Sequence, residues 1–98
     1  MTEAALRPAV IALAGGLREA RTQRGIGLRR LADMVDLHYA ALSSFELGQR
    51  TPSGTTVARI LGVLRSPNEV CDQLIDLAGR AHDRDFVLLA RYTDLELA

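Results

Sequence analysis

The chain has 98 residues, of which 48% are hydrophobic and 24% are charged, and this composition fits one globular domain with a single small core. It contains no apolar run of the roughly eighteen residues that a transmembrane helix needs, so no membrane partner is expected. The single cysteine excludes an internal disulfide and a cysteine-rich zinc site. We interpret the short apolar stretch at residues 9–13 as part of a helix rather than a signal peptide, and we therefore expect a cytoplasmic protein.

The charges balance over the whole chain but are divided unevenly along it. The formal net charge is zero, with twelve basic and twelve acidic residues. Residues 17–65 carry eight arginines and four acidic residues, whereas residues 66–98 carry three arginines and seven acidic residues. The neutral total argues against a nucleic-acid binder, but the basic segment is compatible with one. The two segments are therefore expected to have different functions.

Helical periodicity runs through the whole chain and predicts an all-α fold. The first three helices are expected at about residues 8–24, 28–35 and 39–47. Gly25 and Gly48 are expected to stop the first and the third, because glycine adopts the left-handed conformation that ends many helices. Pro8 is expected at the first helical position, where its missing N–H is not needed.

Two further helices and a less defined segment follow. Ser53 is expected to cap the fourth helix, and the sequence Ser66-Pro67-Asn68-Glu69 is typical of the start of a fifth. Beyond Gly79, the apolar run at residues 86–90 is compatible with a sixth helix or a short strand, and its length favours the helix. On the second, third and fourth helices the predicted core residues are Leu31, Ala32, Val35, Leu42, Phe45, Val57, Ile60, Leu61 and Leu64.

The second and third predicted helices are joined by a tight connection. Asp36 stands where the chain needs a left-handed residue, a conformation that Asp tolerates better than a branched residue does. Leu42 and Phe45 then orient the third helix towards the core. The exposed side chains of that helix are small or polar enough at their near edge to enter a major groove, and they are Tyr39, Ala40, Ser43 and Ser44.

Residues 17–64 resemble the phage-repressor (Xre-type, Cro- and lambda-repressor-like) helix-turn-helix family. The motifs that carry the resemblance are Leu17-Arg-Glu-Ala-Arg21, Gly25-Ile-Gly-Leu-Arg-Arg-Leu-Ala32, Leu42-Ser-Ser-Phe-Glu46, Gly48-Gln-Arg-Thr-Pro52 and Val57-Ala-Arg-Ile-Leu61. The resemblance implies a five-helix DNA-binding domain at residues 1–65, with the helix-turn-helix at residues 28–47. Residues 66–98 are then an additional C-terminal helix or extension that serves as a dimerisation or partner surface.

The resemblance also implies a role for individual residues. The residues expected to contact DNA bases are Tyr39, Ala40, Ser43 and Ser44. The residues expected to contact the DNA backbone are Arg29, Arg30, His38, Gln49, Arg50 and Ser53. Arg21 and Glu46 are expected to form a structural ion pair that braces the third helix. No catalytic residue, metal site or cofactor is expected.

Four positions depart from the family's usual residues. Leu28 stands where many members have a Gln that contacts both a phosphate and the base-reading side chain. Asp36 replaces a more common Gly, and His38 replaces the usual Ser or Thr cap, which leaves that helix start less well satisfied. Tyr39 is bulky where Gln, Arg or Ser is common. Instead of contacting a DNA base, its side chain could pack against a neighbouring helix.

These features predict a sequence-specific regulator that binds double-stranded DNA as a homodimer and acts as a repressor. The residues expected at the dimer or partner surface are Phe86, Val87, Leu89 and Ala90, unless this run folds back over the first helix. The alternative function is an antitoxin-type or adaptor module whose acidic C-terminal segment binds a protein. Loss of DNA binding on a retained scaffold, or membership of a longer ligand-sensing regulator, are further alternatives. An enzyme is disfavoured, because no histidine and carboxylate accompany Ser43 or Ser44 in a catalytic pattern.

Overall fold

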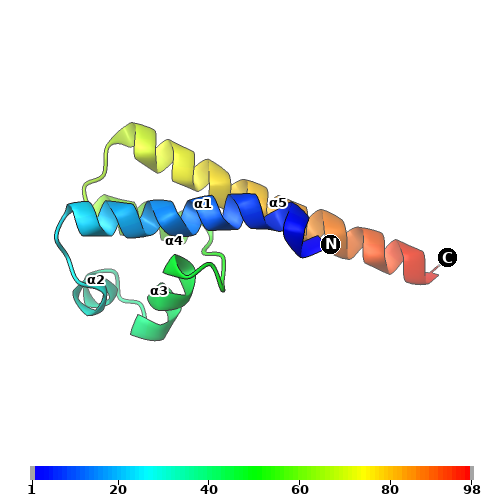
Figure 1. Cartoon of the computed structure of the whole chain (residues 1–98), viewed down its shortest axis with the longest axis horizontal. Coiled ribbons are helices and arrows are strands. Elements are labelled where there is room, and N and C mark those ends of the chain that lie inside the picture. Colours follow the sequence, from blue (N-terminus) through cyan, green and yellow to red (C-terminus); the bar gives the residue numbers. More distant parts are fainter. Residues whose placement is uncertain (1, 98) are drawn as a thin grey trace.

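The computed structural model describes the backbone of residues 2–97 and the side chains of residues 8–82. All secondary structure in the described chain is helical, as predicted (Figure 1). The helices are α1 (Thr2–Gln23), α2 (Leu28–Met34), α3 (Tyr39–Glu46), α4 (Gly54–Val63) and α5 (Asn68–Leu97).

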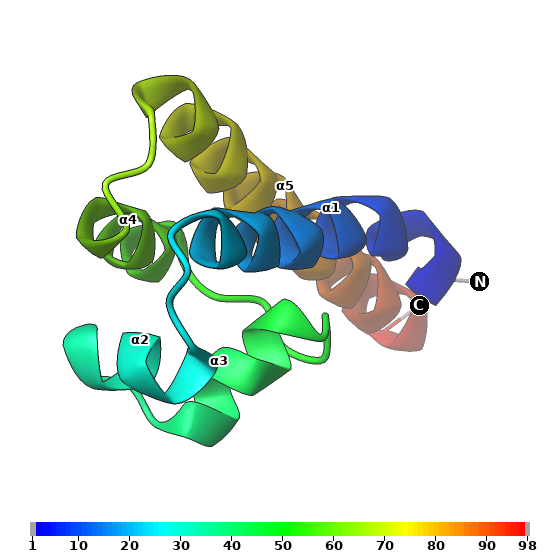
Figure 2. The same ribbon diagram turned by 60° about the vertical axis from the view of Figure 1, so that its left-hand side comes forward.

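The two long helices, α1 and α5, lie side by side along the long axis of the molecule (Figures 1 and 2). α4 packs against α5, while α3 packs against α1 and α2. The short helices α2 and α3 therefore form one side of the molecule, and α5 forms the opposite side (Figure 2). The C-terminal part of α5 projects beyond the other helices, and the molecule measures 51 × 27 × 20 Å.

One apolar core joins all five helices. Every core residue predicted on α2, α3 and α4 and at their ends is buried. Leu13 and Leu17 enter this core from α1, and Leu74 and Ala78 enter it from α5. Full burial of one Leu or Ile side chain contributes about 1.5–3 kcal/mol, so this shared core is the main reason that helices as short as α2 and α3 are stable.

The ends of four helices share one backbone arrangement. Gly25, Asp36, Gly48 and Arg65 follow α1 to α4 with φ values of 65°, 57°, 74° and 52°. In each case the next residue donates its amide N–H to a carbonyl in the last turn, such as Leu37 N–H to Ala32 O at 2.9 Å. The predictions for Gly25, Asp36 and Gly48 are confirmed, whereas the left-handed Arg65 was not predicted. The tight turn after Asp36 sets α3 at a steep angle to α2.

The prediction that Pro8 opens the first helix is wrong, because α1 begins at Thr2 and Pro8 lies inside it. Proline removes the hydrogen bond to the carbonyl four residues earlier but permits helix on its C-terminal side. The preceding residues 3–6 (Glu-Ala-Ala-Leu) have high helix propensity, which favours one further turn.

The fifth helix is longer than predicted. α5 continues through Gly79 to Leu97, so residues 86–90 belong to the same helix and form neither a separate helix nor a strand. A glycine within a helix costs about 1 kcal/mol. Ala78 and Ala81, on either side of Gly79, are fully buried, and this packing holds the helix across the glycine.

Two adjacent glycines of α1 differ in their surroundings. A Cβ atom at Gly16 would lie 2.5 Å from Cδ2 of Leu74, so the missing side chain allows α5 to approach α1 closely. A Cβ atom at Gly15 would meet nothing within 4 Å.

We expect Gly15→Ala to stabilise the protein by about 0.5–1 kcal/mol, because alanine loses less backbone entropy in a helix. Gly16→Ala gains the same propensity but forces the end of the Leu74 side chain to shift, which offsets part or all of that gain. Gly16→Ala should therefore be less stable than Gly15→Ala. Urea denaturation of both variants measures the difference, and equal stabilisation by the two would contradict the close α1–α5 contact.

Candidate nucleic-acid interface

The helix α3 buries one face and leaves the other accessible. Leu42 and Phe45 point into the core. On the outer side, Tyr39 is 43% exposed, Ala40 is exposed, and Ser43 and Ser44 are partly exposed. The four residues assigned to DNA bases therefore lie on the accessible side of one helix.

A buried ion pair fixes α3 to α1. Arg21 donates from Nε to Oε2 of Glu46 at 2.7 Å and from Nη2 to Oε1 at 2.9 Å. Its remaining nitrogen, Nη1, donates to the carbonyl oxygen of Ile26 at 3.0 Å, in the loop between α1 and α2. Arg18 adds a hydrogen bond from Nη2 to the Glu46 carbonyl oxygen at 3.0 Å. The structure thus contains the ion pair that the resemblance implied, together with two further contacts that the sequence did not indicate.

The contact with Glu46 stabilises the charge of Arg21 in spite of its burial. The side chains of Arg21 and Glu46 are only 16% and 6% exposed. The hydrogen bonds that Arg21 donates to Glu46 raise the pKa of the Arg21 guanidinium above its usual range, and this effect exceeds the lowering by burial. Arg21 therefore keeps its charge wherever the protein is folded, and the pair contributes no net charge to the surface.

A third arginine also acts within the fold. Arg59 of α4 donates from Nη2 to the carbonyl oxygen of Val35 at 2.6 Å, at the end of α2. The Arg21–Glu46 pair removes one cation and one anion, and Arg18 and Arg59 are exposed and bond to neutral carbonyl oxygens, so the basic excess of residues 17–65 is unchanged. The guanidinium groups of these three arginines are, however, each engaged in a contact within the protein.

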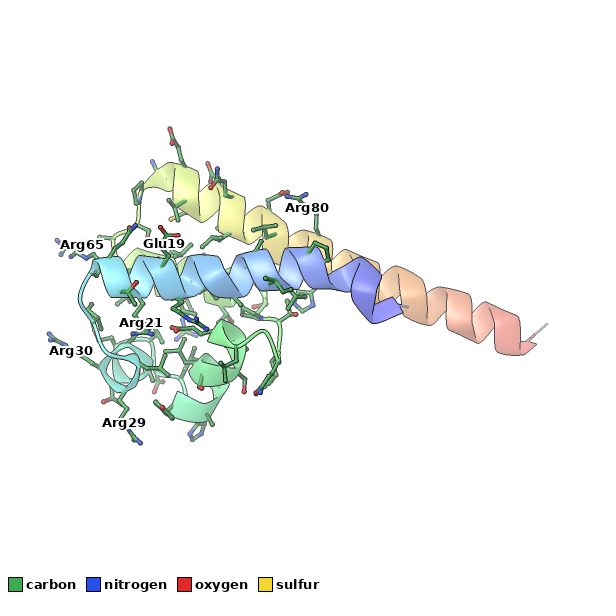
Figure 3. All side chains as sticks on the ribbon, viewed as in Figure 1. Glu19, Arg21, Arg29, Arg30, Arg65 and Arg80 are labelled. Atoms are coloured by element: carbon green, nitrogen blue, oxygen red, sulfur yellow. The ribbon has the colours of Figure 1, made fainter. Side chains whose placement is uncertain are left out.

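The cations beside α3 come from α2 and from the loop at residues 47–53. Arg29 and Arg30 are exposed on α2, and Arg29 points away from α1 (Figure 3). Gln49 and Arg50 are exposed after α3, and the Arg50 guanidinium lies 5.7 Å from the centre of the Phe45 ring. The structure therefore places cationic side chains near both ends of α3.

The loop that carries Gln49 and Arg50 is held by backbone contacts. The amides of both residues donate to the Ser44 carbonyl oxygen, at 3.0 and 3.3 Å, and so close the end of α3. His82 of α5 donates from Nε2 to the Pro52 carbonyl oxygen at 3.1 Å. The side chains of Gln49 and Arg50, rather than their backbone N–H groups, are thus available to a ligand.

Two other residues assigned to the DNA backbone have different surroundings. The Ser53 hydroxyl accepts from the Thr56 amide at 3.1 Å and caps α4 as predicted, and it also donates to the Thr56 hydroxyl. His38 is exposed at the start of α3 and makes no side-chain capping bond. The hydroxyl of Ser53 is therefore engaged within the protein, while the His38 ring is free to contact a ligand.

Tyr39 contacts the neighbouring helix α2, an alternative that the sequence left open, but its partner Arg29 was not anticipated. The guanidinium carbon of Arg29 lies over the Tyr39 ring, 4.4 Å from its centre, within the range of a cation–π interaction. Tyr39 therefore contacts the start of α2 instead of packing into the core. The sequence showed that Tyr39 is unusually bulky for its position at the start of α3, but no local pattern indicated that it would contact Arg29.

The residues assigned to the dimer or partner surface lie near the C-terminus of the chain. Phe86, Val87, Leu89 and Ala90 fall in α5 but outside the residues whose side chains the structure describes. In the described part of the chain, no helix combines the length and apolar character needed to cross a membrane. Residues 8–82 also contain no group of three or more side chains suited to bind a metal ion.

A comparison with protein families agrees with this geometry. The model of a helix-turn-helix domain matches residues 17–69, just over half of the chain, from the C-terminal third of α1 to the start of α5. The chain belongs to the Xre/Cro/lambda-repressor-like helix-turn-helix family. No curated protein and no solved structure matches the chain.

Membership gives the helix-turn-helix domain a general function. The family consists of DNA-binding transcription regulators and is not a family of enzymes. Within the domain, α2 and α3 are the two helices of the motif, and Asp36 lies in the turn between them. The accessible side of α3 is therefore the candidate DNA-contacting surface.

The buried ion pair should be a major determinant of the stability of the helix-turn-helix domain. Glu46→Ala leaves the Arg21 charge buried without its partner, and we expect a loss of about 3 kcal/mol in the free energy of unfolding. Arg21→Lys should also be destabilising, because lysine cannot bond both carboxylate oxygens and Ile26 together. Chemical denaturation measures both losses.

The exposed pair Arg80–Asp76 provides the matched control. Its atoms are 2.7 Å apart, but its side chains are 61% and 64% exposed. Asp76→Ala should change the stability by less than about 1 kcal/mol, because solvent screens an exposed pair. A similar loss for Glu46→Ala and Asp76→Ala would show that burial does not strengthen the Arg21–Glu46 contact.

Proposed function

We propose that this protein is a sequence-specific repressor that binds double-stranded DNA as a homodimer, with α3 in the major groove. The observation that carries the proposal is the position of α3. Its inner face is fixed by Arg21 and the core, while its outer face is accessible and has cations near both ends. A bound dimer would repress by excluding polymerase from the DNA that it covers.

The outer face of α3 suits a groove contact. The major groove is about 12 Å wide and admits one α-helix when the side chains facing the bases are not too large. Ala40, Ser43 and Ser44 are small, so the helix axis can approach the base edges closely. The serine hydroxyls can donate to or accept from bases, and the Ala40 methyl group can contact a thymine methyl group.

Phosphate contacts are assigned to the cationic and polar side chains around α3. Arg30 and His38 lie on the α2 side, and Gln49 and Arg50 lie at the other end. These contacts would set the position of α3 on the duplex without reading its sequence. We leave Ser53 out of this group because its hydroxyl is already bonded to Thr56.

The dimer proposal is supported by the shape of α5. This helix extends beyond the rest of the molecule (Figure 1), and its sequence carries an apolar run at residues 86–90. One domain of this size buries too little surface for tight specific binding, and two copies on an inverted repeat double the contact. Pairing of the projecting parts of α5 from two copies would supply that symmetry. The predicted compartment is the cytoplasm, since the DNA would be there.

A groove between α1 and α5 favours an antitoxin-type or adaptor function as the second candidate. The groove has a volume of about 670 Å³, with Ile11 and Leu77 among its apolar residues and Glu19, Asp76 and Arg80 among its charged ones. It lies on the other side of α1 from α3, so a protein bound there would leave α3 accessible. No measurable affinity for any duplex at low ionic strength would favour this function over the first.

Substitutions should separate phosphate contacts from base contacts. Arg50→Ala should weaken binding about equally on all duplexes and reduce the slope of log K against log salt by about one unit. Ser44→Ala should change the selected sequence and leave the salt slope unaltered. Fluorescence anisotropy with duplexes from a random-pool selection measures both effects.

Arg80→Ala is the matched control for charge. This arginine is exposed but lies in the α1–α5 groove, away from α3. Its loss should leave both the selected sequence and the salt slope unchanged. If Arg80→Ala weakens binding as much as Arg50→Ala does, the DNA-contacting surface is not the one around α3.

The dimer should depend on the apolar run of α5. Phe86→Asp and Leu89→Asp should convert a dimer into a folded monomer, because a charge in an apolar interface is not compensated. Size-exclusion chromatography with light scattering gives the mass, and circular dichroism gives the helix content. Leu88→Asp is the control, since helical periodicity places position 88 on the side opposite position 86. Loss of the dimer in all three variants, or unfolding with Phe86→Asp, would contradict the assigned surface.

A further inference from the structure

We propose that Arg29 reads a guanine base in the major groove and that Tyr39 is the residue that positions it. This inference rests on the proposed DNA-binding function and assigns one specificity-determining contact within it. Family resemblance alone assigns Arg29 to a phosphate. The contact between Arg29 and Tyr39 points to a base instead.

The two residues come from the two helices of the motif. Arg29 is the second residue of α2, and Tyr39 is the first residue of α3. The Arg29 guanidinium carbon lies 4.4 Å from the centre of the Tyr39 ring. The guanidinium is therefore held against the first turn of α3, which is the turn whose side chains contact base edges when such a helix enters the major groove.

The chemistry of the contact leaves Arg29 able to bind a base. When a guanidinium stacks on an aromatic ring, its face makes the contact and its N–H donors, at the edge of the same plane, remain available. Guanine presents O6 and N7 next to each other in the major groove, and an arginine edge can donate to both. Among residues 8–82 the ion pairs are Arg21–Glu46 and Arg80–Asp76, so no described carboxylate competes for Arg29.

The contact with Tyr39 orients the Arg29 guanidinium before DNA binds, and this favours a base over a phosphate as its ligand. A phosphate accepts hydrogen bonds from many directions, so a mobile cation serves it well. A guanine edge accepts two bonds in one plane, so a guanidinium already held by an aromatic ring loses less conformational freedom on binding. Arg30 provides the contrast, because it is exposed on the same helix and leaves it in a different direction (Figure 3).

The test is selection of duplexes from a random pool with the full chain and four variants. The wild-type motif should contain a guanine that Arg29→Ala and Tyr39→Leu no longer select. Tyr39→Phe should retain it, because phenylalanine keeps the ring face and loses only the hydroxyl. Arg30→Ala is the matched control and should retain the guanine as well. Thermal melting shows whether each variant is folded, and if Tyr39→Leu is unfolded, Arg29→Ala alone decides.

A second measurement identifies the base atom. Replacing the selected guanine with 7-deazaguanine removes the N7 acceptor and should weaken wild-type binding by roughly 5- to 150-fold. The same replacement should have little effect on Arg29→Ala, because that variant has no side-chain donor for the base.

The inference is overturned if Arg29→Ala and Tyr39→Leu keep the guanine and weaken binding equally on all duplexes. Arg29 is then a phosphate contact. If the wild-type protein selects no motif and binds no duplex at low ionic strength, the proposed function itself fails, and the inference fails with it. The two failures are distinguishable, because only the first leaves a defined motif.

Discussion

The ion pair between Arg21 and Glu46 is the interaction on which the position of α3 depends. Glu46 is 5% exposed, and an isolated carboxylate at that depth would strongly destabilise the fold. The fork of Arg21 meets both of its oxygens and also bonds Ile26, so one side chain joins α1, the following loop and α3. Apolar packing of Leu42 and Phe45 alone allows small rotations of α3 about its axis, whereas the two paired hydrogen bonds are directional. The pair thereby determines which residues of α3 face outward.

The positions of the arginines in the fold add information that a count of charges along the sequence does not contain. A count over residues 17–65 gives four more basic than acidic residues, but it does not show where the cations lie in the fold. Arg21 is paired with Glu46, whereas Arg18 and Arg59 are exposed although each also donates to a carbonyl oxygen. Arg29 and Arg50 lie near the two ends of α3. The neutral total of the chain is therefore a weak argument against DNA binding, because the local distribution of free cations sets the potential that a phosphate meets.

The sequence predicted features that depend on neighbouring residues better than those that join distant ones. The turns at Gly25, Asp36 and Gly48 follow from backbone conformation, which the local residue type largely determines. The buried residues of α2, α3 and α4 follow from periodicity. The continuous α5 was missed because packing on both sides of Gly79 outweighs its low helix propensity, and that packing involves α1 and α4. The contact of Arg29 with Tyr39 was missed for the same reason, since it joins two helices across a turn.

The two ends of α3 are held very differently. At the C-terminal end, the Glu46 side chain bonds Arg21, its carbonyl oxygen bonds Arg18, and the Ser44 carbonyl oxygen accepts two amides. At the N-terminal end, His38 provides no side-chain cap, and the Tyr39 ring is held by one exposed contact with Arg29. The first turn nevertheless packs on the core through Leu37 and Ala41. The contacts at the C-terminal end therefore keep α3 in register with the rest of the domain, and the contact with Arg29 orients the exposed ring at its start.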